Sequence, residues 1–202
     1  MYLPKHFAET DVAEMHALMR AHPLATLVST GPDGLNANHI PLLLADGKLQ
    51  GHVARANPLW KDGQVAGEVL LIFQGHESYI SPSGYATKAE HGKVVPTWNY
   101  TAVHAWGDLR VIDDPAWVFT QISALTATHE AALPQPWAVT DAPADYIEKM
   151  LGAIVGIEIT INRLLGKWKV SQNQPAANQA SLIAALEKAG DPMAGLIRQH
   201  RQ

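Results

Sequence analysis

The segment "HIPLLLADGKLQGHVARANP", residues 39–58, decides the expected fold, because an Asp-Gly pair at 46–47 joins two apolar runs. Asp-Gly between apolar runs favours a two-residue β-hairpin, since the turn needs positive φ at both central positions. We therefore expect strands over 35–45 and 48–54. A further strand over 24–30, joined through "GPDG", extends the pattern into an antiparallel meander.

The same reasoning along the rest of the chain predicts the remaining elements. Apolar runs predict strands over 68–75, 77–81, 94–112 and 153–172. Helical periodicity and cap residues predict helices over 10–22, from Asp114-Pro115 onward, and over 144–151, 178–190 and 191–200. The turn-rich segment 82–93 is expected to be an exposed loop.

Three of these helices carry specific expectations at their ends. In the first, Asp11 is expected to be the N-cap with Glu14 completing a capping box, and the apolar face comprises Val12, Met15, Leu18 and Met19. In the helices expected over 178–190 and 191–200, Asn178 and Asp191 are the expected N-caps, and Gly190 is expected to end the first of the two.

The order of elements predicts a mainly β chain with helices (α+β), an antiparallel barrel with flanking and C-terminal helices. Alternating βαβ units and a G-x-G-x-x-G segment are both missing from the sequence, which disfavours a Rossmann fold. We expect residues 1–174 to form the barrel domain and 175–202 to form a helical appendage packed on it.

Composition limits the class of protein and its partners. The 202 residues include no Cys, which excludes disulfides and thiolate chemistry, and 47% are hydrophobic, as in a globular domain. The sequence contains neither a signal-peptide core nor a run of about 18 apolar residues, so we expect a cytoplasmic protein without membrane contact. A net charge of −4 makes direct DNA binding doubtful, because phosphate neutralisation supplies most of the affinity of DNA-binding proteins.

The segment after the second hairpin strand predicts an anion site. Asn57 is a favoured N-cap and Pro58 suits the first helical position, so a short helix is expected to begin there with free N–H groups. Such an end attracts anions, Arg55 beside it can bind phosphate through two N–H groups, and Lys61 is near in sequence. The alternative is a surface arginine followed by an ordinary cap.

Two further segments are candidates for binding a planar ligand. Tyr79, Tyr85, Trp98 and Tyr100 lie close together in sequence around Asn99, a combination of aromatic and polar groups that can hold a ring system. "KWKVSQNQ" (167–174) ends a strand with two cations, a tryptophan and four polar side chains. The alternatives are core packing for the aromatics and a solvated strand end for the second segment.

Seven segments in order resemble the PaiB family of FMN-binding proteins, which are labelled negative transcriptional regulators. They are "MYLPKHF" (1–7), "HIPLLL" (39–44), "GHVARANP" (51–58), "YISPS" (79–83), "VPTWNY" (95–100), "HAWG" (104–107) and "GKWKVSQN" (166–173). The resemblance implies a flavin split β-barrel, similar to pyridoxamine-phosphate oxidases, that works as a homodimer with FMN at the interface.

The resemblance also implies which residues bind FMN. The phosphate would lie at the segment 54–61, and the ring would border one strand and its hairpin partner, with a second wall contributed in part by the other subunit. The residues implied are His39, Ile40, Pro41, His52, Val53, Ala54, Arg55, Asn57, Trp60, Lys61, Asn99, Tyr100, Lys167, Gln172 and Asn173. One position departs from the family: Gly84 stands where members commonly have Trp, which predicts a more open loop over the flavin.

Signatures of catalysis and of metal binding are weak. The ten histidines form no His-x-x-x-His or His-Glu-x-x-His pattern, and no serine has a nucleophile-elbow context. His39 and His52 could face each other across the hairpin, for which a structural or flavin-side role is favoured over a metal. The alternative functions are a flavin-dependent oxidoreductase related to pyridoxamine-phosphate oxidases and, more weakly, a haem-handling split barrel; in an enzyme the flavin would carry the chemistry.

Overall fold

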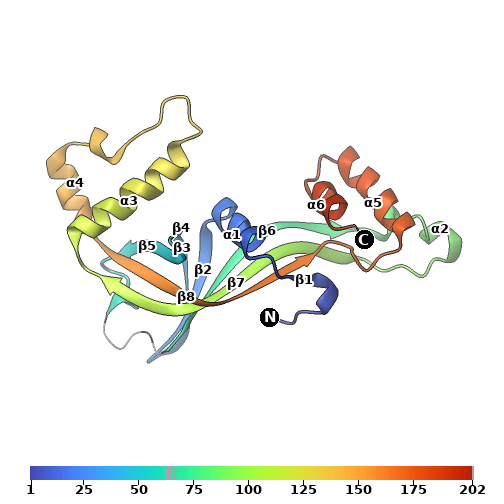
Figure 1. Ribbon diagram of the computed structural model, residues 1–202, viewed down its shortest axis with the longest axis horizontal. Helices are drawn as coiled ribbons and strands as arrows, with labels where there is room; N and C mark the ends of the chain where they lie inside the picture. The colour runs from blue at the N-terminus through green and yellow to red at the C-terminus, as the bar shows by residue number, and fades with distance from the viewer. Residues whose placement is uncertain (62–64, 66, 202) are drawn as a thin grey trace. The chain divides into compact units, whose positions relative to one another are not determined.

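A computed structural model describes residues 1–61, 65 and 67–201 (Figure 1). Its strands form an eight-stranded sheet in the order β3-β2-β6-β7-β8-β5-β4, with β1 paired to β8. The strands are β1 (Ala8–Glu9), β2 (Leu24–Gly31), β3 (Gly34–Pro41), β4 (Leu43–Ala45), β5 (Lys48–Ala54), β6 (Val69–Ile80), β7 (Thr97–Ile112) and β8 (Ile154–Lys169). This is the antiparallel α+β architecture that the sequence predicts.

The helices are short apart from α3 and α5. They are η1 (Lys5–Phe7), α1 (Val12–Ala21), η2 (Pro58–Trp60), η3 (Pro82–Gly84), α2 (Lys88–His91), α3 (Pro115–Glu130), η4 (Val139–Asp141), α4 (Ala144–Leu151), α5 (Ala176–Lys188) and α6 (Met193–Gln199). No helix in the described part of the chain combines the length and the hydropathy needed to cross a membrane.

The chain divides into two compact units. The first comprises residues 1–18, 74–103 and the segment from Leu165 to the C-terminus, and the second comprises 19–73 and 104–164. Strands β6, β7 and β8 contribute residues to both units, because their bounds cross these limits.

The second unit contains the hairpins that the sequence predicts. Asp46 and Gly47 have φ of 49° and 74°, the positive values that a two-residue turn between β4 and β5 requires. The predicted strand over 35–45 is broken at Leu42, because β3 pairs with β2 whereas β4 pairs with β5. Leu42 is buried, and its N–H donates to Pro23 O at 2.9 Å. A change of pairing partner thus produces a break that apolar periodicity does not reveal.

The core of the second unit is made by alternate residues of its strands. Leu27, Leu49, Leu71, Ile157 and Ile159 are all fully buried, as expected for the inward face of a half-buried sheet. Helix α3 packs on β5 and lies beside α4 (Figure 1). This places a helical layer next to the strand that leads to the predicted anion site.

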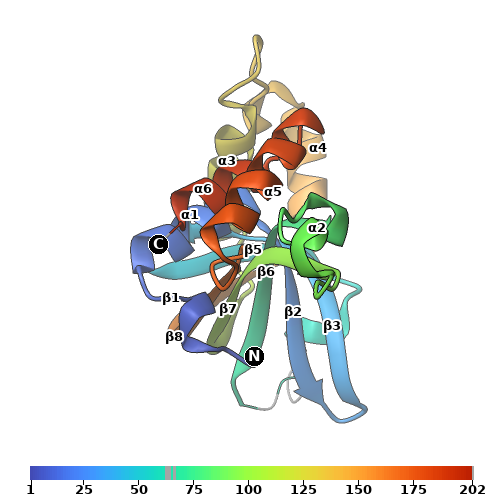
Figure 2. The same ribbon diagram turned by 90° about the vertical axis from the view of Figure 1, so that its right-hand side faces the viewer.

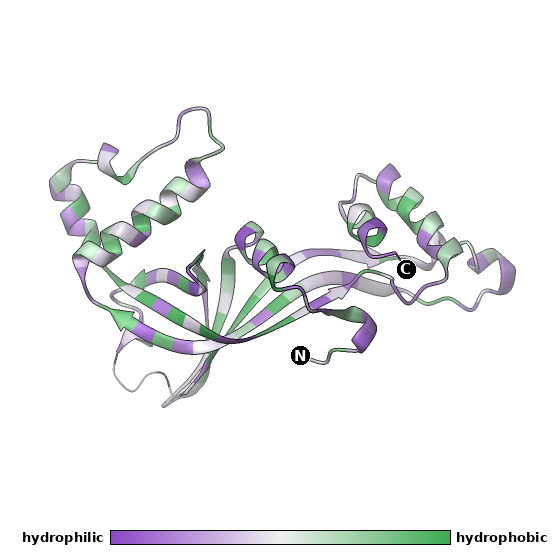
Figure 3. Cartoon of the chain, viewed as in Figure 1, coloured by the Kyte–Doolittle hydropathy of each residue, from purple (hydrophilic) through white to green (hydrophobic). Residues whose placement is uncertain are grey.

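In the first unit, α5 and α6 pack against each other and bury their apolar faces (Figures 2 and 3). The large apolar side chains buried on these helices are Leu182, Ile183, Leu186, Met193 and Ile197. Asp191 caps α6 as predicted, with Met193 N donating to its Oδ1 at 2.9 Å. The domain boundary expected at residue 175, between the barrel and the C-terminal helices, stays a prediction.

Several local predictions for the first unit were wrong. Val12 is exposed, whereas Met15 and Leu18 are buried as expected. Glu9, rather than Glu14, accepts the hydrogen bond from Asp11 N. These positions lie at the start of a helix, where one residue of rotation decides which side chain faces inward.

Three further predictions also need correction. Asn178 lies within α5 rather than at its start, and its buried Oδ1 accepts from Thr87 N at 3.0 Å. Segment 82–93 contains η3 and α2 rather than only loop. The two strands predicted over 68–75 and 77–81 form the single strand β6, which passes through Gly75 without interruption; a Cβ there would lie 2.2 Å from Thr101 Oγ1.

Candidate functional site

The chain leaves β5 at Ala54 and turns directly into η2, which confirms the cap predicted at Asn57. Asn57 is extended (φ −72°, ψ 127°), and its Oδ1 accepts a hydrogen bond from Leu59 N at 2.9 Å. Pro58 occupies the first turn, where its missing N–H costs nothing. Because η2 is a single short turn and its Leu59 amide is already bonded, it offers fewer free donors than a regular helix would.

The Arg55 side chain lies beside this turn and binds a carboxylate that the sequence did not point to. Its Nη2 donates to Asp113 Oδ1 at 2.6 Å and its Nη1 to Asp113 Oδ2 at 3.0 Å, while Nε donates to Gly152 O at 2.8 Å. The hydrogen bonds between them raise the pKa of Arg55 and lower the pKa of Asp113. The side chains are 37% and 50% exposed, so water reaches both partners.

The other residues of the turn surround Arg55. Trp60 Nε1 donates to Arg55 O at 2.9 Å, and the guanidinium lies 5.5 Å from the centre of the Trp60 ring. Lys61 is exposed and has no ion pair with any described residue. Asn57 Nδ2 donates to Asn38 Oδ1 at 2.7 Å, and the buried Nδ2 of Asn38 has no hydrogen-bond partner in the described chain. Asn38 is a candidate that sequence reasoning missed, because it lies on another strand.

The predicted ring-bordering strand is β3. His39 and Pro41 are exposed and Ile40 is buried, since successive side chains of a strand point to opposite faces. His39 Nδ1 lies 3.0 Å from the hydroxyl of Thr26 on β2. The exposed backbone and side chains of β3 are therefore available to a ligand, apart from Ile40.

His52 and Val53 on β5 point to opposite faces of their strand. Val53 belongs to the core, and His52 Nδ1 lies 2.9 Å from Gln121 Oε1 on α3. The expectation that His39 and His52 face each other is wrong, because β5 pairs with β4 and β8 while His39 is bonded to Thr26. Among residues 1–61, 65 and 67–201, no cluster of His, Asp and Glu could hold a metal ion.

The remaining predicted residues lie in the first unit, and two of them are committed to internal hydrogen bonds. Asn99 is 1% exposed, and its Nδ2 donates to Ser171 Oγ at 2.9 Å. Gln172 closes a turn, accepting from Val170 N at 2.8 Å and donating to Trp168 O at 2.5 Å. Neither side chain is free to contact a ligand in this conformation.

The other three residues of this group differ in exposure. Lys167 is buried, donates to Tyr2 O at 3.0 Å and has its Nζ 5.2 Å from the Tyr100 ring centre. Tyr100 is half-buried and Asn173 is exposed. Burial and the nearby charge of Lys167 lower the pKa of Lys169. The segment therefore concentrates positive charge next to an aromatic ring.

The aromatic candidates separate into exposed and buried groups. Tyr79 and Trp98 are each 54% exposed and meet edge to face with ring centres 5.8 Å apart, whereas Tyr85 is buried. Burial raises the pKa of Tyr85. Core packing thus accounts for Tyr85 but not for the exposed pair.

Gly84, in the loop that follows β6, lies beside α5 and lines a pocket of about 300 Å³ together with Tyr79 and Leu182. A Cβ at this position would lie 3.2 Å from Leu182 Cδ1, and Ser181 Oγ donates to Gly84 O at 2.8 Å. Helix α5 therefore covers the position at which a side chain would stand. The expected opening of the loop over the flavin stays a prediction.

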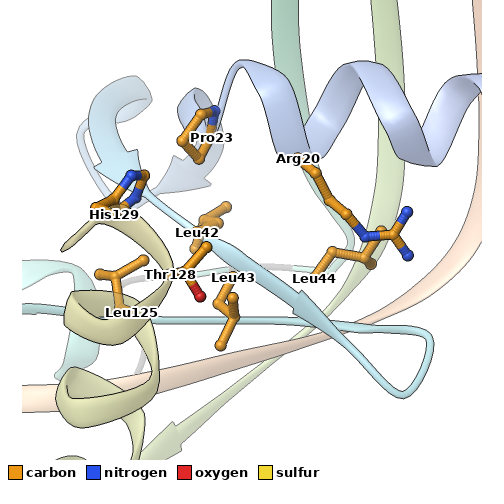
Figure 4. A pocket seen from close by; sticks show the side chains of 8 residues that line it. All are labelled: Arg20, Pro23, Leu42, Leu43, Leu44, Leu125, Thr128 and His129. Carbon is orange, nitrogen blue, oxygen red and sulfur yellow. The ribbon is translucent and has the colours of Figure 1, made fainter. Parts of the chain in front are cut away.

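A small apolar pocket of about 250 Å³ lies between the segment after β3 and helix α3 in the second unit (Figure 4). Leu42, Leu43 and Leu125 line its interior, and Arg20 and His129 stand at its two ends. The side chains of Arg20 and His129 are both exposed. We assign no ligand to this pocket.

The architecture is shared with solved structures of flavin-binding proteins. The FAD and heme binding protein of Mycobacterium smegmatis superposes with a TM-score of 0.60 at 16% identity, covering 80% of this chain and 73% of that chain. The flavocytochrome Anf3 of Azotobacter vinelandii gives 0.59 at 16% identity, covering 83% and 72%. At this identity the likeness concerns the fold alone, which is the split barrel predicted from the sequence.

Comparison of sequences identifies the family. Residues 1–163 match the family described as "Putative FMN-binding domain", so the chain belongs to this FMN-binding family. It is 33% identical over 243 residues to the Emericella nidulans protein AN0679, covering 98% of this chain and 97% of that protein. It is 28% identical over 198 residues to "Protease synthase and sporulation protein PAI 2" of Bacillus subtilis, covering 96% and 93%. The PaiB resemblance and FMN as cofactor are thereby confirmed.

Proposed function

We propose that this FMN-binding protein is a homodimeric regulator that holds the flavin phosphate at the segment 54–61. The proposal rests on one observation above the others: Arg55 and Lys61 flank a turn that is capped by Asn57 at the end of a buried strand. Cations beside backbone amides at the end of a strand suit a phosphate monoester, because they supply charge and directional donors together.

The residues at this turn fit a phosphate in two respects. Lys61 is a cation without a partner among the described residues, and Asn38 Nδ2 is a buried donor without an acceptor. A buried donor that lacks a partner is unfavourable, and an anion oxygen would satisfy it. The same two residues would keep the phosphate close to the cap of η2.

Asp113 opposes this placement of the phosphate, because its carboxylate accepts hydrogen bonds from both Nη1 and Nη2 of Arg55. Ion pairs between exposed side chains contribute little net stability, because water screens them and ordering two side chains costs entropy. A dianionic phosphate offers Arg55 a stronger partner of the same geometry. Arg55 therefore exchanges Asp113 for the phosphate in the proposed complex.

The ring of FMN would border the exposed side of β3 at His39 and Pro41, with backbone groups near Ile40 within reach. Tyr100, Lys167 and Asn173 would contribute to the second wall, and Asn99 and Gln172 would support them through the hydrogen bonds described above. Which subunit supplies the second wall is part of the homodimer proposal. Bound FMN would supply a redox centre, and the protein would position it and exclude water.

A regulatory role through partners fits the charge distribution better than direct binding to DNA. The paired helices α5 and α6 superficially resemble a helix-turn-helix, but Arg198 on α6 is bonded to Glu187 on α5. A net charge of −4 further reduces attraction to a phosphate backbone. We expect no mobility shift with duplex DNA at about 0.15 M salt.

The absorbance spectrum of the freshly purified protein tests the function directly. FMN binding predicts flavin bands between about 350 and 500 nm and an FMN-dependent rise in melting temperature. Size-exclusion chromatography with light scattering tests the homodimer at the same time. Colourless protein that FMN does not stabilise would refute the binding proposal, and rapid flavin bleaching by NADH or NADPH would favour an oxidoreductase instead.

A further inference from the structure

A second pocket of the second unit, here called the α3–α4 pocket, has features of a site for a small aromatic molecule. It has a volume of about 250 Å³ and lies among α3, η4, α4 and the strands β5 and β8. Its lining includes the apolar side chains of Ile122, Ile147 and Ile154. The imidazole of His52 also lines it. A dry cavity of about 150 Å³ already accommodates benzene, so this volume suits a molecule of one or two rings.

The rim of the α3–α4 pocket is aromatic and exposed. Trp137 and Tyr146 both line it and are 47% and 53% exposed, and Met150 beside them is 37% exposed. Single exposed apolar side chains are ordinary, but a contiguous group of them around a hollow is a feature of binding sites. Aromatic rings in this position can stack against a planar ligand through their faces and edges.

The polar group of the pocket is held in a defined orientation. Gln121 on α3 is only 2% exposed, and its Oε1 lies 2.9 Å from His52 Nδ1. With the Gln121 amide in this orientation, Oε1 accepts from Nδ1 of a neutral His52, and Nε2 of that ring is an acceptor. The buried Nε2 of Gln121 has no partner in the described chain, so burying this amide costs free energy.

We propose that the α3–α4 pocket binds an aromatic molecule of one or two rings that carries a single hydroxyl or ring N–H. The donor of the molecule bonds Nε2 of His52, and its rings lie between Ile122, Ile147 and the rim residues Trp137 and Tyr146. This assignment does not depend on FMN and gives His52 a role separate from the flavin site. It follows from the volume, the mainly apolar lining and the oriented imidazole of His52.

Indole and 1-methylindole form a matched pair of probes, because methylation removes the N–H donor and adds only one methyl group. Calorimetric titration of the FMN-saturated full-length protein should show saturable indole binding that is about 5- to 10-fold tighter than 1-methylindole binding. His52→Phe should remove this preference while keeping the size of the side chain. Equal binding of the two probes by the wild-type protein would overturn the proposal, and so would no binding of either.

A second variant separates loss of the pocket from loss of the fold. Ala142→Phe places a ring inside the cavity and should abolish binding of both probes, whereas Leu133→Ala, at an exposed position outside the lining, should not change it. Circular dichroism melting and the flavin spectrum establish that each variant is folded and retains FMN. Undiminished indole binding by folded Ala142→Phe would overturn the assignment. Displacement of indole by FMN in the apoprotein would do the same, because the pocket would then belong to the flavin site.

Discussion

Arg55 and Asp113 form a two-point ion pair, with Nη2–Oδ1 and Nη1–Oδ2 distances of 2.6 and 3.0 Å, at the turn where the flavin phosphate is proposed to bind. The two residues lie in different connections of the chain: Arg55 follows β5, and Asp113 lies between β7 and α3. The pair thus brings a competing anion to the segment that local sequence identifies as cationic, which makes the phosphate assignment testable from both partners.

Removal of Arg55 should weaken FMN binding. Arg55→Ala should raise the Kd roughly 10- to 100-fold, because a charge-assisted donor to the phosphate is lost, and Asp113→Asn should lower the Kd because a competing carboxylate is removed. Fluorescence quenching of FMN on titration with protein measures both. Arg163→Ala is the control, since that cation stacks on Trp106 away from the turn. Unchanged affinity in Arg55→Ala would place the phosphate elsewhere.

Sequence reasoning succeeded where local chemistry decides the structure. The positive φ of Asp46 and Gly47 and the cap made by Asn57 depend on neighbours within a few residues, so both were predictable. The partner of Arg55 was not, because Asp113 is brought to it only by the packing of distant segments. The strand break at Leu42 was not predictable for the same reason. It follows from the change of pairing partner between β3 and β4, not from the hydropathy of Leu42.

The second wall of the candidate site shows the same limit. Asn99 lies between two aromatic residues in the sequence, which favours an amide that binds a ligand. In the fold its Nδ2 instead donates to the hydroxyl of Ser171, 72 residues away, inside the core. Gly84 lies beside Leu182 of α5, a neighbour that the sequence around Gly84 does not reveal. In both cases a residue type indicates what a side chain can do, whereas long-range packing decides whether it is free to do it.

The carboxylate of Glu158 on β8 should make stability depend on pH. Burial favours a raised pKa, but hydrogen bonds from Lys48, Gln50 and Arg110 outweigh it and hold the pKa below the usual 4.5. A lowered pKa means stabilisation that is complete above the unfolded value and is lost as pH falls through the folded value. Urea unfolding should show Glu158→Gln less stable by about 1–2 kcal/mol at pH 7, with the difference shrinking as the pH falls below 4.5.

The matched control for Glu158 is Glu90→Gln on α2, an exposed carboxylate outside this cluster. It should leave the free energy of unfolding nearly unchanged at both pH values. A deficit in Glu158→Gln that stays constant down to acid pH would show that lost packing, rather than charge, causes it.

Asp191 should anchor the C-terminal helices of the first unit. Its carboxylate accepts from Ser78 Oγ at 2.6 Å and from Met193 N at 2.9 Å and lies 2.8 Å from His76 Nε2. These contacts outweigh burial and lower its pKa. Asp191→Ala should cost about 1–3 kcal/mol and accelerate amide exchange in α6, measured by hydrogen–deuterium exchange with mass spectrometry. Asp145→Ala on exposed α4 is the comparison, and equal exchange in the two variants would contradict the anchoring role.

Gly156 on β8 should not tolerate even a methyl group. A Cβ there would lie 2.5 Å from Trp117 Cζ3 and 2.9 Å from Ile112 O, so either the indole or the strand must move. Overpacking of this kind costs about 1–3 kcal/mol. Gly195→Ala in α6 is the control, because no heavy atom lies within 4 Å of its added methyl and alanine favours a helix by about 1 kcal/mol. Chemical denaturation should therefore move the two variants in opposite directions, and a Gly156→Ala protein as stable as wild type would show that Trp117 has room to withdraw.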